Sequence, residues 1–255
     1  MKKHIPNLFT LLNLFFGCIA IVYALQNGIA FTRNEGEQFI QLKENICLAS
    51  LFIAIAAVVD FLDGFVARLL DIPTEMGKQL DSLADVVSFG VAPGIILYQF
   101  LRMGFIKEAD GMETSILYLV PAFIYTCAGA YRLARFNLDT TQSFGFKGVP
   151  IPAAGLVVAS LPLIYWYGSS DAIYNLIINK WFLYSLIILL SWLMVSNLPI
   201  MAMKFKDRTL KNNLPKIILV TIAILSAILL KWFAVPIIFI AYIILSLALK
   251  NKTTT

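Results

Sequence analysis

The sequence predicts an all-α, polytopic membrane helical bundle of about eight transmembrane helices. Hydrophobic residues make up 60% of the 255-residue chain and charged residues only 14%, whereas soluble domains are roughly 45–50% apolar. Apolar runs of about 20 residues, the length needed to cross a ~30 Å hydrocarbon core, recur from Leu8 to Leu249. Because no long polar segment separates these runs, we expect a single transmembrane domain over residues 1–255.

Each expected span is a continuous apolar run, and the eight runs follow one another closely along the chain. Their ranges are 8–30, 46–70, 79–101, 115–138, 150–168, 176–201, 214–230 and 233–249. Only the segment KWFAV separates the last two, and Pro236 could instead kink a single re-entrant element. Seven spans would place the C-terminus on the outer side of the membrane.

The distribution of basic residues supports eight spans through the positive-inside rule. Fourteen fall on one side and six on the other, together the 20 Lys and Arg of the chain. The smaller group is Arg33, Lys43, Arg102, Lys107, Lys180 and Lys231. We therefore expect a cell-membrane protein whose two termini and 71–78 loop face the cytoplasm. The net charge of +5 then reflects topology and attraction to anionic lipids. We do not expect nucleic-acid binding, because the sequence has no basic motif with interleaved aromatic residues.

The N-terminus and the cysteines add little chemistry. MKKHIPNLFT places basic residues before an apolar run without a small-residue cleavage site, so we expect the first span to be retained. Cys18, Cys47 and Cys127 lie on or beside separate spans with no CxxC or Cys/His cluster. We expect them to be packing residues rather than disulfide or zinc ligands.

Four aspartates lie among the apolar residues of the second and third spans: Asp60, Asp63, Asp81 and Asp85. A charged side chain at mid-bilayer costs at least about 2.5–3.5 kcal/mol, so these acids need compensating partners. The first two are three residues apart and the last two are four apart. Each pair therefore lies on one face of its helix, one turn separated.

The segment LLDIPTEMGKQ between these spans predicts a helical hairpin, because Pro73 breaks the helix and Gly77 permits a turn. The two acid pairs can then face one another. Asp60 lies ten residues before Leu70, about 15 Å along a straight helix, which places the acids within reach of cytoplasmic water and ions. Small residues beside the acids predict a hydrated cleft rather than packing alone. They are Gly64, Ala67, Ala84 and Ser88.

The acid cluster predicts a divalent-cation site. Four carboxylates a few ångströms apart repel one another unless a cation neutralises them. Hard oxygen ligands favour Mg²⁺, Mn²⁺ or Ca²⁺, whereas zinc or copper would favour Cys or His, and His4 is the only histidine in the chain. With Arg68 nearby, such a site suits a diphosphate substrate and a phosphoryl-type transfer. Proton transfer would then fall to a carboxylate, a lysine or a metal-bound water.

Acidic residues in membrane helices are also typical of two other functions. Intramembrane acids also line cation or proton pathways, although transporters tend to spread them over several spans or over broken helices in related halves. A membrane prenyltransferase also binds diphosphates through aspartates on helices. Its aspartate motifs are spaced differently and lack the surrounding Gly, Ala and Arg residues.

The spacing of the acids and their neighbours resembles the signature of the CDP-alcohol phosphotransferase family. The matching residues are Asp60-x2-Asp63-Gly64-x2-Ala67-Arg68-x8-Gly77-x3-Asp81-x3-Asp85. The resemblance implies a helical membrane enzyme, usually a homodimer, that moves a phosphatidyl or related group from a CDP-linked donor to an alcohol and releases CMP. It assigns all four aspartates to a divalent-metal site and makes Asp85 the general base. The CDP moiety would contact Asn7, Thr10, Asp60, Gly64, Ala67, Arg68 and Gly77.

Segments outside the signature are similar to the integral-membrane members of the family that use L-serine as acceptor. They are IPNLFTLLNLFFG, DSLADVVSFGVAPG, AYRLARFNL and FKGVPIPAAG. Together they extend the resemblance over residues 5–155 and imply CDP-diacylglycerol and L-serine as substrates. Glycerol 3-phosphate or inositol phosphate remains an alternative acceptor, because the signature serves several alcohols.

Further polar residues are candidates for substrate contacts. L-Serine carries a carboxylate, and Arg132, Arg135 and Lys147 lie on the expected cytoplasmic side; the alternative is that they anchor the helix to lipid headgroups. Arg132 and Arg135 share a helical face, which suits a carboxylate or phosphate. Asn13 shares a stripe of the first span with Asn7 and Thr10, and interhelical hydrogen bonding is an equally good explanation for it.

Overall fold

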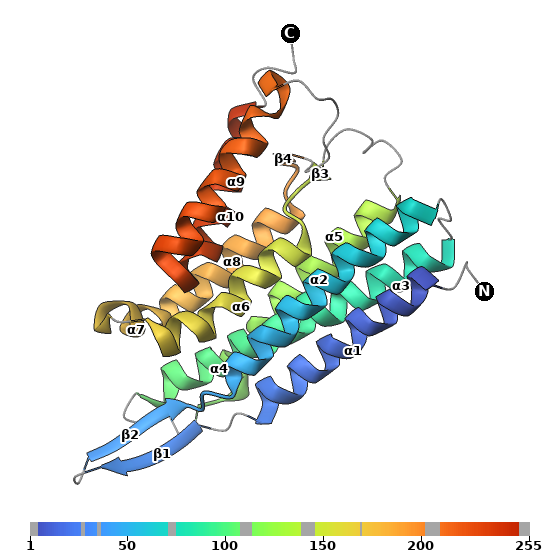
Figure 1. Ribbon diagram of the computed structural model, residues 1–255. Helices are drawn as coiled ribbons and strands as arrows, with labels where there is room; N and C mark the ends of the chain where they lie inside the picture. The colour runs from blue at the N-terminus through green and yellow to red at the C-terminus, as the bar shows by residue number, and fades with distance from the viewer. Residues whose placement is uncertain are drawn as a thin grey trace.

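The computed structural model describes residues 5–26, 29–34, 37–70, 75–107, 114–138, 146–168, 170–201 and 210–249. These residues are nearly all helical, which confirms the predicted helical class (Figure 1). Among them, four helices are long and apolar enough to cross a membrane, or five if the bent pair α7 (Asp171–Ile177) and α8 (Lys180–Val195) forms one span. The number of eight spans therefore stays a prediction.

The other helices follow one another in the order shown by Figure 1. They are α1 (Ile5–Gln26), α2 (Ile46–Leu70), α3 (Glu75–Asp85), the π-helical η2 (Val86–Val91), α4 (Ala92–Ile106), the short η4 (Ile116–Tyr118), α5 (Ala122–Leu138), α6 (Ile151–Tyr167), α9 (Leu210–Leu230), η5 (Lys231–Phe233) and α10 (Ala234–Leu249). Two short antiparallel ribbons pair β1 (Ile29–Asn34) with β2 (Glu37–Leu42) and β3 (Phe146–Lys147) with β4 (Pro199–Ile200).

The first predicted span is wrong at its end, and the β1–β2 hairpin was missed. Helix α1 stops at Gln26, and the hairpin projects beyond the helices (Figure 1). The sequences IAFTRN and EQFIQL are two runs with aromatic and β-branched residues, separated by Glu-Gly. That pattern is a hairpin signal, which the apolar stretch before it obscured.

The predicted turn at Gly77 is also wrong, because Gly77 lies inside α3, which begins at Glu75. Pro73 lies outside the described residues. The third span is longer than expected: α3, η2 and α4 continue from residue 75 to residue 106. An acidic residue in the first turn, as Glu75 is here, favours a helix start at this point through the helix dipole.

Two later boundaries differ for local reasons. Helix α5 begins at Ala122, directly after Pro121, instead of at residue 115. The predicted 176–201 span is broken, because the Asn179 side chain accepts hydrogen bonds from the backbone N–H groups of Trp181 and Phe182 and so caps a new helix, α8. The second and fifth spans agree with α2 and α6 within a residue.

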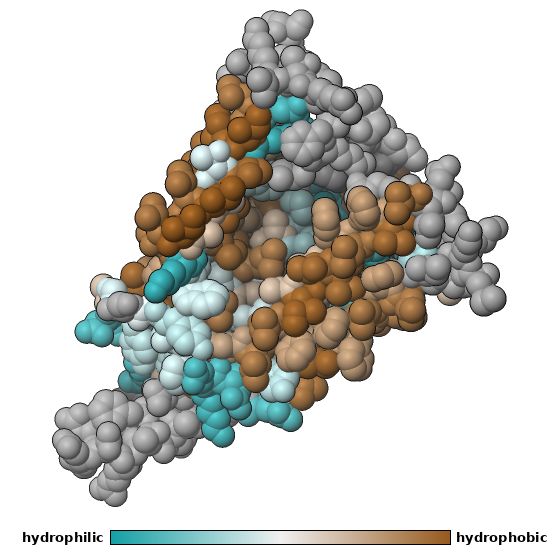
Figure 2. All heavy atoms as spheres, viewed as in Figure 1, coloured by the Kyte–Doolittle hydropathy of each residue, from teal (hydrophilic) through white to brown (hydrophobic). Residues whose placement is uncertain are grey.

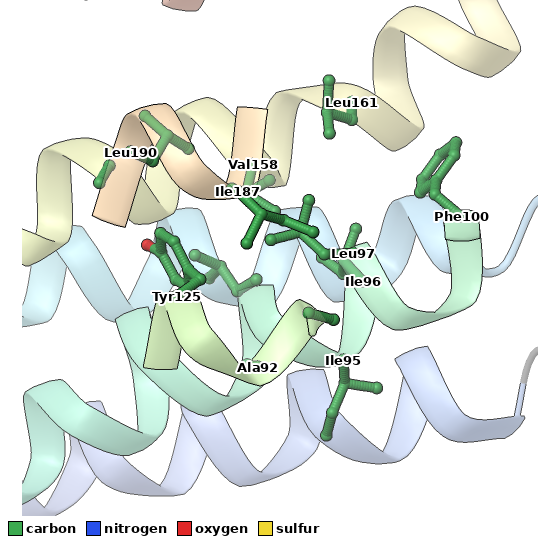
Figure 3. Packing of buried hydrophobic residues seen from close by; sticks show 14 of the residues in the cluster. Ala92, Ile95, Ile96, Leu97, Phe100, Tyr125, Val158, Leu161, Ile187 and Leu190 are labelled. Atoms are coloured by element: carbon green, nitrogen blue, oxygen red, sulfur yellow. The ribbon is translucent and has the colours of Figure 1, made fainter. Parts of the chain in front are cut away.

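Helix α4 lies at the centre of the apolar core. Figure 3 shows side chains of α4, among them Ile96 and Leu97, meeting Val158 of α6 and Ile187 of α8. Helix α1 packs closely on α2 and also contacts α3, η2 and α4, and its Ala20 and Ala24 are small and fully buried. The outward faces carry many large apolar side chains, and Figure 2 shows them as brown bands with the polar residues gathered near α7. Such a surface suits a multi-pass membrane protein.

The π-helical segment η2 directly follows Asp85 and is held by α5. A π-helix leaves backbone groups without their usual helical partners. Here the Tyr125 hydroxyl donates to the Phe89 carbonyl at 2.9 Å, and the Thr126 hydroxyl donates to the Gly90 carbonyl, also at 2.9 Å. Helix α5 therefore fixes the backbone that follows the last aspartate.

The C-terminal helices α9 and α10 pack against each other around η5, where Lys231 has a φ of 48°. Residues 214–230 and 233–249 thus belong to two separate helices. Helix α10 joins the bundle through α6 and β4. The Tyr242 hydroxyl donates to the Met201 carbonyl at 2.9 Å, and the Met201 N–H donates to Ser246 Oγ at 3.1 Å.

We predict that Tyr125→Phe lowers the free energy of unfolding by about 1–3 kcal/mol, because it leaves the buried Phe89 carbonyl without its donor. Thermal unfolding of the purified protein in detergent measures this. Tyr131→Phe, on the exposed face of the same helix, is the control and leaves the melting temperature unchanged. Equal melting temperatures for the two variants would show that the Tyr125 hydroxyl does not hold η2.

Candidate functional site

Three of the four aspartates converge between α2 and α3. One carboxylate oxygen each of Asp60, Asp63 and Asp81 lies within 4.8 Å of the others. The i, i+3 spacing places Asp60 and Asp63 on one face of α2, and α1 packs against both α2 and α3. The predicted helical hairpin therefore placed the acid-bearing faces of α2 and α3 next to each other correctly, although Gly77, the predicted turn residue, lies within α3. Three carboxylates at this separation form a donor set for a hard divalent cation.

Asp85 lies at the end of α3 and is also buried, with 7% of its surface exposed. It does not belong to the group of three, but it is close enough to Asp60, Asp63 and Asp81 to interact with them electrostatically. Its Oδ1 accepts a hydrogen bond from Asn13 Nδ2 at 3.5 Å. The four acids thus form a group of three possible metal ligands and one further buried carboxylate.

Helix α1 lines the acid cluster with the predicted polar stripe. The Thr10 hydroxyl donates to Asp63 Oδ2 at 2.9 Å and lies 3.2 Å from the Pro6 carbonyl oxygen. Asn7 is half-buried one turn earlier. Asn13, one turn later, contacts Asp85. One face of α1 therefore contacts acids from both α2 and α3.

Gly64 leaves an open space beside Asp63. A Cβ atom at Gly64 would have no heavy atom within 4 Å, other than those of its own helix backbone and chain neighbours. This space is what the close approach of a substrate to the helix would require. The half-buried Gly77 lies in the first turn of α3. The side chains of Ala67 and Arg68 lie outside the described residues, so their expected contacts with CDP stay predictions.

The two arginines of α5 have different surroundings despite their shared helical face. Arg132 is 6% exposed, interacts electrostatically with Asp85, and its Nε has no hydrogen-bond partner among the described residues. Its guanidinium carbon lies 5.3 Å from the centre of the Phe136 ring. Among the described side chains, Arg132 is thus a buried basic residue whose charge acts on Asp85.

Arg135 is instead engaged at the end of α8. Its Nη1 donates to the Val195 carbonyl at 2.7 Å and its Nη2 to the Ser196 carbonyl at 3.0 Å. Nη2 also lies 3.4 Å from the carbonyl of Lys147, whose side chain is exposed in β3. These contacts favour a structural role for Arg135, and a substrate role for Arg135 or Lys147 stays a prediction.

Sequence reasoning missed a polar link between α3 and α5. Asn137 Nδ2 donates to Ser82 Oγ at 2.8 Å, and Lys78 Nζ donates to the Asn137 carbonyl at 3.0 Å. Ser82 directly follows Asp81, so the link holds the acid-bearing helix against the helix that carries Arg132. Its only sequence signal is that Asn137 falls within AYRLARFNL.

A helical membrane bundle with converging aspartates and a buried arginine fits one class of membrane transferase. The chain belongs to the CDP-alcohol phosphatidyltransferase family, whose model matches residues 3–194. A CDP-diacylglycerol–serine O-phosphatidyltransferase of Helicobacter pylori (strain ATCC 700392 / 26695) is 37% identical over 198 residues, 76% of this chain and 70% of that protein. The enzyme of the same name from Bacillus subtilis (strain 168) is 36% identical over 130 residues, 49% of this chain and 65% of that protein.

An archaeal relative carries a related name. The archaetidylserine synthase of Methanothermobacter thermautotrophicus is 32% identical over 176 residues, 68% of this chain and 64% of that protein. The family match ends at residue 194, in α8, so α9 and α10 lie beyond it.

We predict that Gly64→Ala raises thermal stability while weakening the binding of a CDP-linked donor. Alanine is favoured over glycine inside a helix by about 0.5–1 kcal/mol, and the added methyl group meets open space. The same methyl group would occupy the space proposed for the donor, so the KM for donor should rise about tenfold or more. Melting curves and donor titrations measure the two effects.

Gly17→Ala is the matched contrast, because a Cβ there would collide with the Ser88 side chain. It should lower the melting temperature. A Gly64→Ala variant that gains stability with an unchanged donor KM would remove Gly64 from the donor site.

Proposed function

We propose that this protein transfers the phosphatidyl group of CDP-diacylglycerol to the hydroxyl of L-serine, giving phosphatidylserine and CMP. The observation that carries the proposal is the convergence of Asp60, Asp63 and Asp81, with carboxylate oxygens within 4.8 Å, in a chain of the CDP-alcohol phosphatidyltransferase family. Relatives named as serine transferases support serine as the acceptor. Because an archaetidylserine synthase is also related, the lipid chains of the donor are left open.

Asp60, Asp63 and Asp81 would hold a divalent cation, Mg²⁺ or Mn²⁺, with Asp85 adjacent. Their oxygen-only donor set and their separation fit such an ion. When bound, the cation supplies charge neutralisation for the donor diphosphate and makes its phosphorus more electrophilic. Asn7, Thr10, Asp60, Gly64, Ala67, Arg68 and Gly77 would surround the CDP moiety, and the space beside Gly64 supports this assignment.

Asp85 would act as the general base. Its carboxylate takes the proton of the serine hydroxyl while that oxygen attacks the lipid-side phosphorus. The bond from this phosphorus to the bridging oxygen of the diphosphate breaks, and CMP leaves with that oxygen, so no covalent enzyme intermediate forms. The burial of Asp85 supports this role, because a base excluded from bulk water favours attack by the acceptor over hydrolysis.

Arg132 would bind the serine carboxylate. The electrostatic interaction of Arg132 with Asp85 supports this role, whereas Arg135 is engaged by backbone carbonyls at the end of α8. A buried guanidinium with a donor not used by the described residues suits a carboxylate ligand. Arg135 and Lys147 are second candidates for anion contacts.

We further propose eight membrane-spanning helices in a single domain, a homodimer, and an active site and two termini that face the cytoplasm. The excess of Lys and Arg on one side supports this orientation. The aspartates on α2 lie in its C-terminal half, toward the same side. Figure 1 places the N-terminal end of α1 near the start of α3, as this topology requires.

We predict that the purified protein releases CMP from CDP-diacylglycerol only when both L-serine and Mg²⁺ or Mn²⁺ are present. Chelation with EDTA should lower the rate at least about 100-fold, because the diphosphate and the aspartates then repel one another. A panel of acceptors measured by CMP release tests the assignment. Turnover with glycerol 3-phosphate or inositol phosphate in place of serine would overturn the assignment of serine as the acceptor, while the assignment to the family would stand. Full activity in EDTA would overturn the metal site.

A further inference from the structure

Asn13 is a buried amide whose role the signature does not assign. Its side chain is fully buried in the middle of α1, one turn after Thr10. Nδ2 donates to Asp85 Oδ1 at 3.5 Å, at the long end of hydrogen-bond lengths. Oδ1 has no hydrogen-bond partner among the described residues. The donor half of the amide is thus directed at the proposed base, while the acceptor half is left unused.

The contact between α1 and η2 does not depend on this side chain. The Ser88 hydroxyl donates to the backbone carbonyl of Asn13 at 3.1 Å. One turn further on, Gly17 packs so closely against Ser88 that a Cβ would collide with it. These contacts between the backbone of α1 and Ser88 already hold α1 against η2. The contact between α1 and η2 therefore does not need the Asn13 side chain, whose amide N–H is instead directed at Asp85.

The surroundings of Asp85 explain what the amide could contribute. Asp60, Asp63 and Asp81 repel the carboxylate of Asp85, and Arg132 attracts it from the direction of α5. Asn13 Nδ2 is the hydrogen-bond donor that reaches it from α1. A carboxylate with one oxygen held by a donor presents its other oxygen in a defined direction. Hydrogen bonds of catalytic groups that are long in a free enzyme often shorten when substrate binds.

We propose that Asn13 is a positioning residue for Asp85. Its amide N–H holds Oδ1 of the carboxylate against α1, so that Oδ2 is directed at the hydroxyl of the acceptor. The inference rests on the proposed function, in which Asp85 is the general base. Misplacing a catalytic group by about 1 Å can cost roughly 100-fold in rate, so loss of the amide should lower kcat about 10- to 100-fold. The KM values for donor and for serine should change less than about threefold.

Asn13→Leu tests the proposal, because leucine is similar in size and carries no polar atom. The melting temperature should stay the same or rise, since an unpaired buried oxygen is removed. The kcat for CMP release with L-serine should nevertheless fall 10- to 100-fold. A purely structural Asn13 would give the opposite result, with lower stability and an unchanged kcat per folded protein.

Gln99→Met is the matched control. Gln99 is also a buried amide that links α1 to another helix, it donates to the Ala24 carbonyl at 2.9 Å, and its Oε1 likewise has no partner among the described residues. No hydrogen bond joins Gln99 to a carboxylate among the described residues, so the kcat of the Gln99→Met variant should stay within about twofold of the parent protein. Equal losses of kcat in the two variants would assign the effect to helix packing and overturn the proposal.

The Asp85→Asn background separates this inference from the proposed function. If Asn13 acts through Asp85, adding Asn13→Leu to Asp85→Asn should lower the remaining rate no further. An active Asp85→Asn variant would overturn the base assignment itself. An inactive Asp85→Asn variant together with a fully active Asn13→Leu variant would overturn only the positioning role. If Asn13→Leu does not fold, Asn13→Ala is judged by the same kinetic criteria on the monodisperse fraction.

Discussion

The repulsion between carboxylates is the interaction on which the rest of this structure depends. Oxygens of Asp60, Asp63 and Asp81 lie within 4.8 Å of one another in helices whose outer faces are apolar. At an effective dielectric constant of about 20, two unit charges at this distance repel by roughly 3–4 kcal/mol. A hydrogen bond to a charged group, such as that from Thr10 to Asp63, stabilises the folded protein by only about 1.5–3 kcal/mol. Protonation of a carboxylate or a bound cation removes this repulsion, and the proposed cation would offset all three pairs at once.

The neighbouring helices keep the acids together by packing that does not use the acids. Helix α1 packs against α2 and α3, and it approaches η2 closely because Gly17 leaves room for the Ser88 side chain. Helix α5 holds the π-helical segment after Asp85 through Tyr125 and Thr126. The scaffold thus fixes the repelling groups in advance, so the proposed cation would meet a site that costs little to reorganise.

The sequence was sufficient for the helical class and for the acid faces, because both follow from simple periodicities. Spacings of three and four residues place Asp60 with Asp63 and Asp81 with Asp85 whatever the rest of the chain does. The side chains that surround Asp85 were harder to predict from the sequence, because they depend on which helices become neighbours in the fold. Nothing in the spacing of Arg132 and Arg135 shows that one reaches Asp85 while the other binds carbonyls at the end of α8.

The errors in the fold prediction have local causes as well. The β1–β2 hairpin was obscured by the apolar stretch that precedes it, and the π-helical geometry of η2 is stabilised by hydroxyls of α5, a helix distant in the sequence. Gly77 was assigned to a turn because glycine is common there, but tertiary packing allowed α3 to include it. Hydropathy also says little about the number of spans, because α7 and α8 bend at Asn179 and the α6 helix is short.

A crystal structure of the protein with Mn²⁺, examined by anomalous scattering, tests the central claim most directly. The claim is that a divalent cation between α2 and α3 offsets the repulsion of the acids. The predicted result is an anomalous peak at coordination distance, about 2.0–2.6 Å, from oxygens of Asp60, Asp63 and Asp81. A catalytically active crystal form with no peak between these three carboxylates, or with Mn²⁺ bound only elsewhere, would contradict the account.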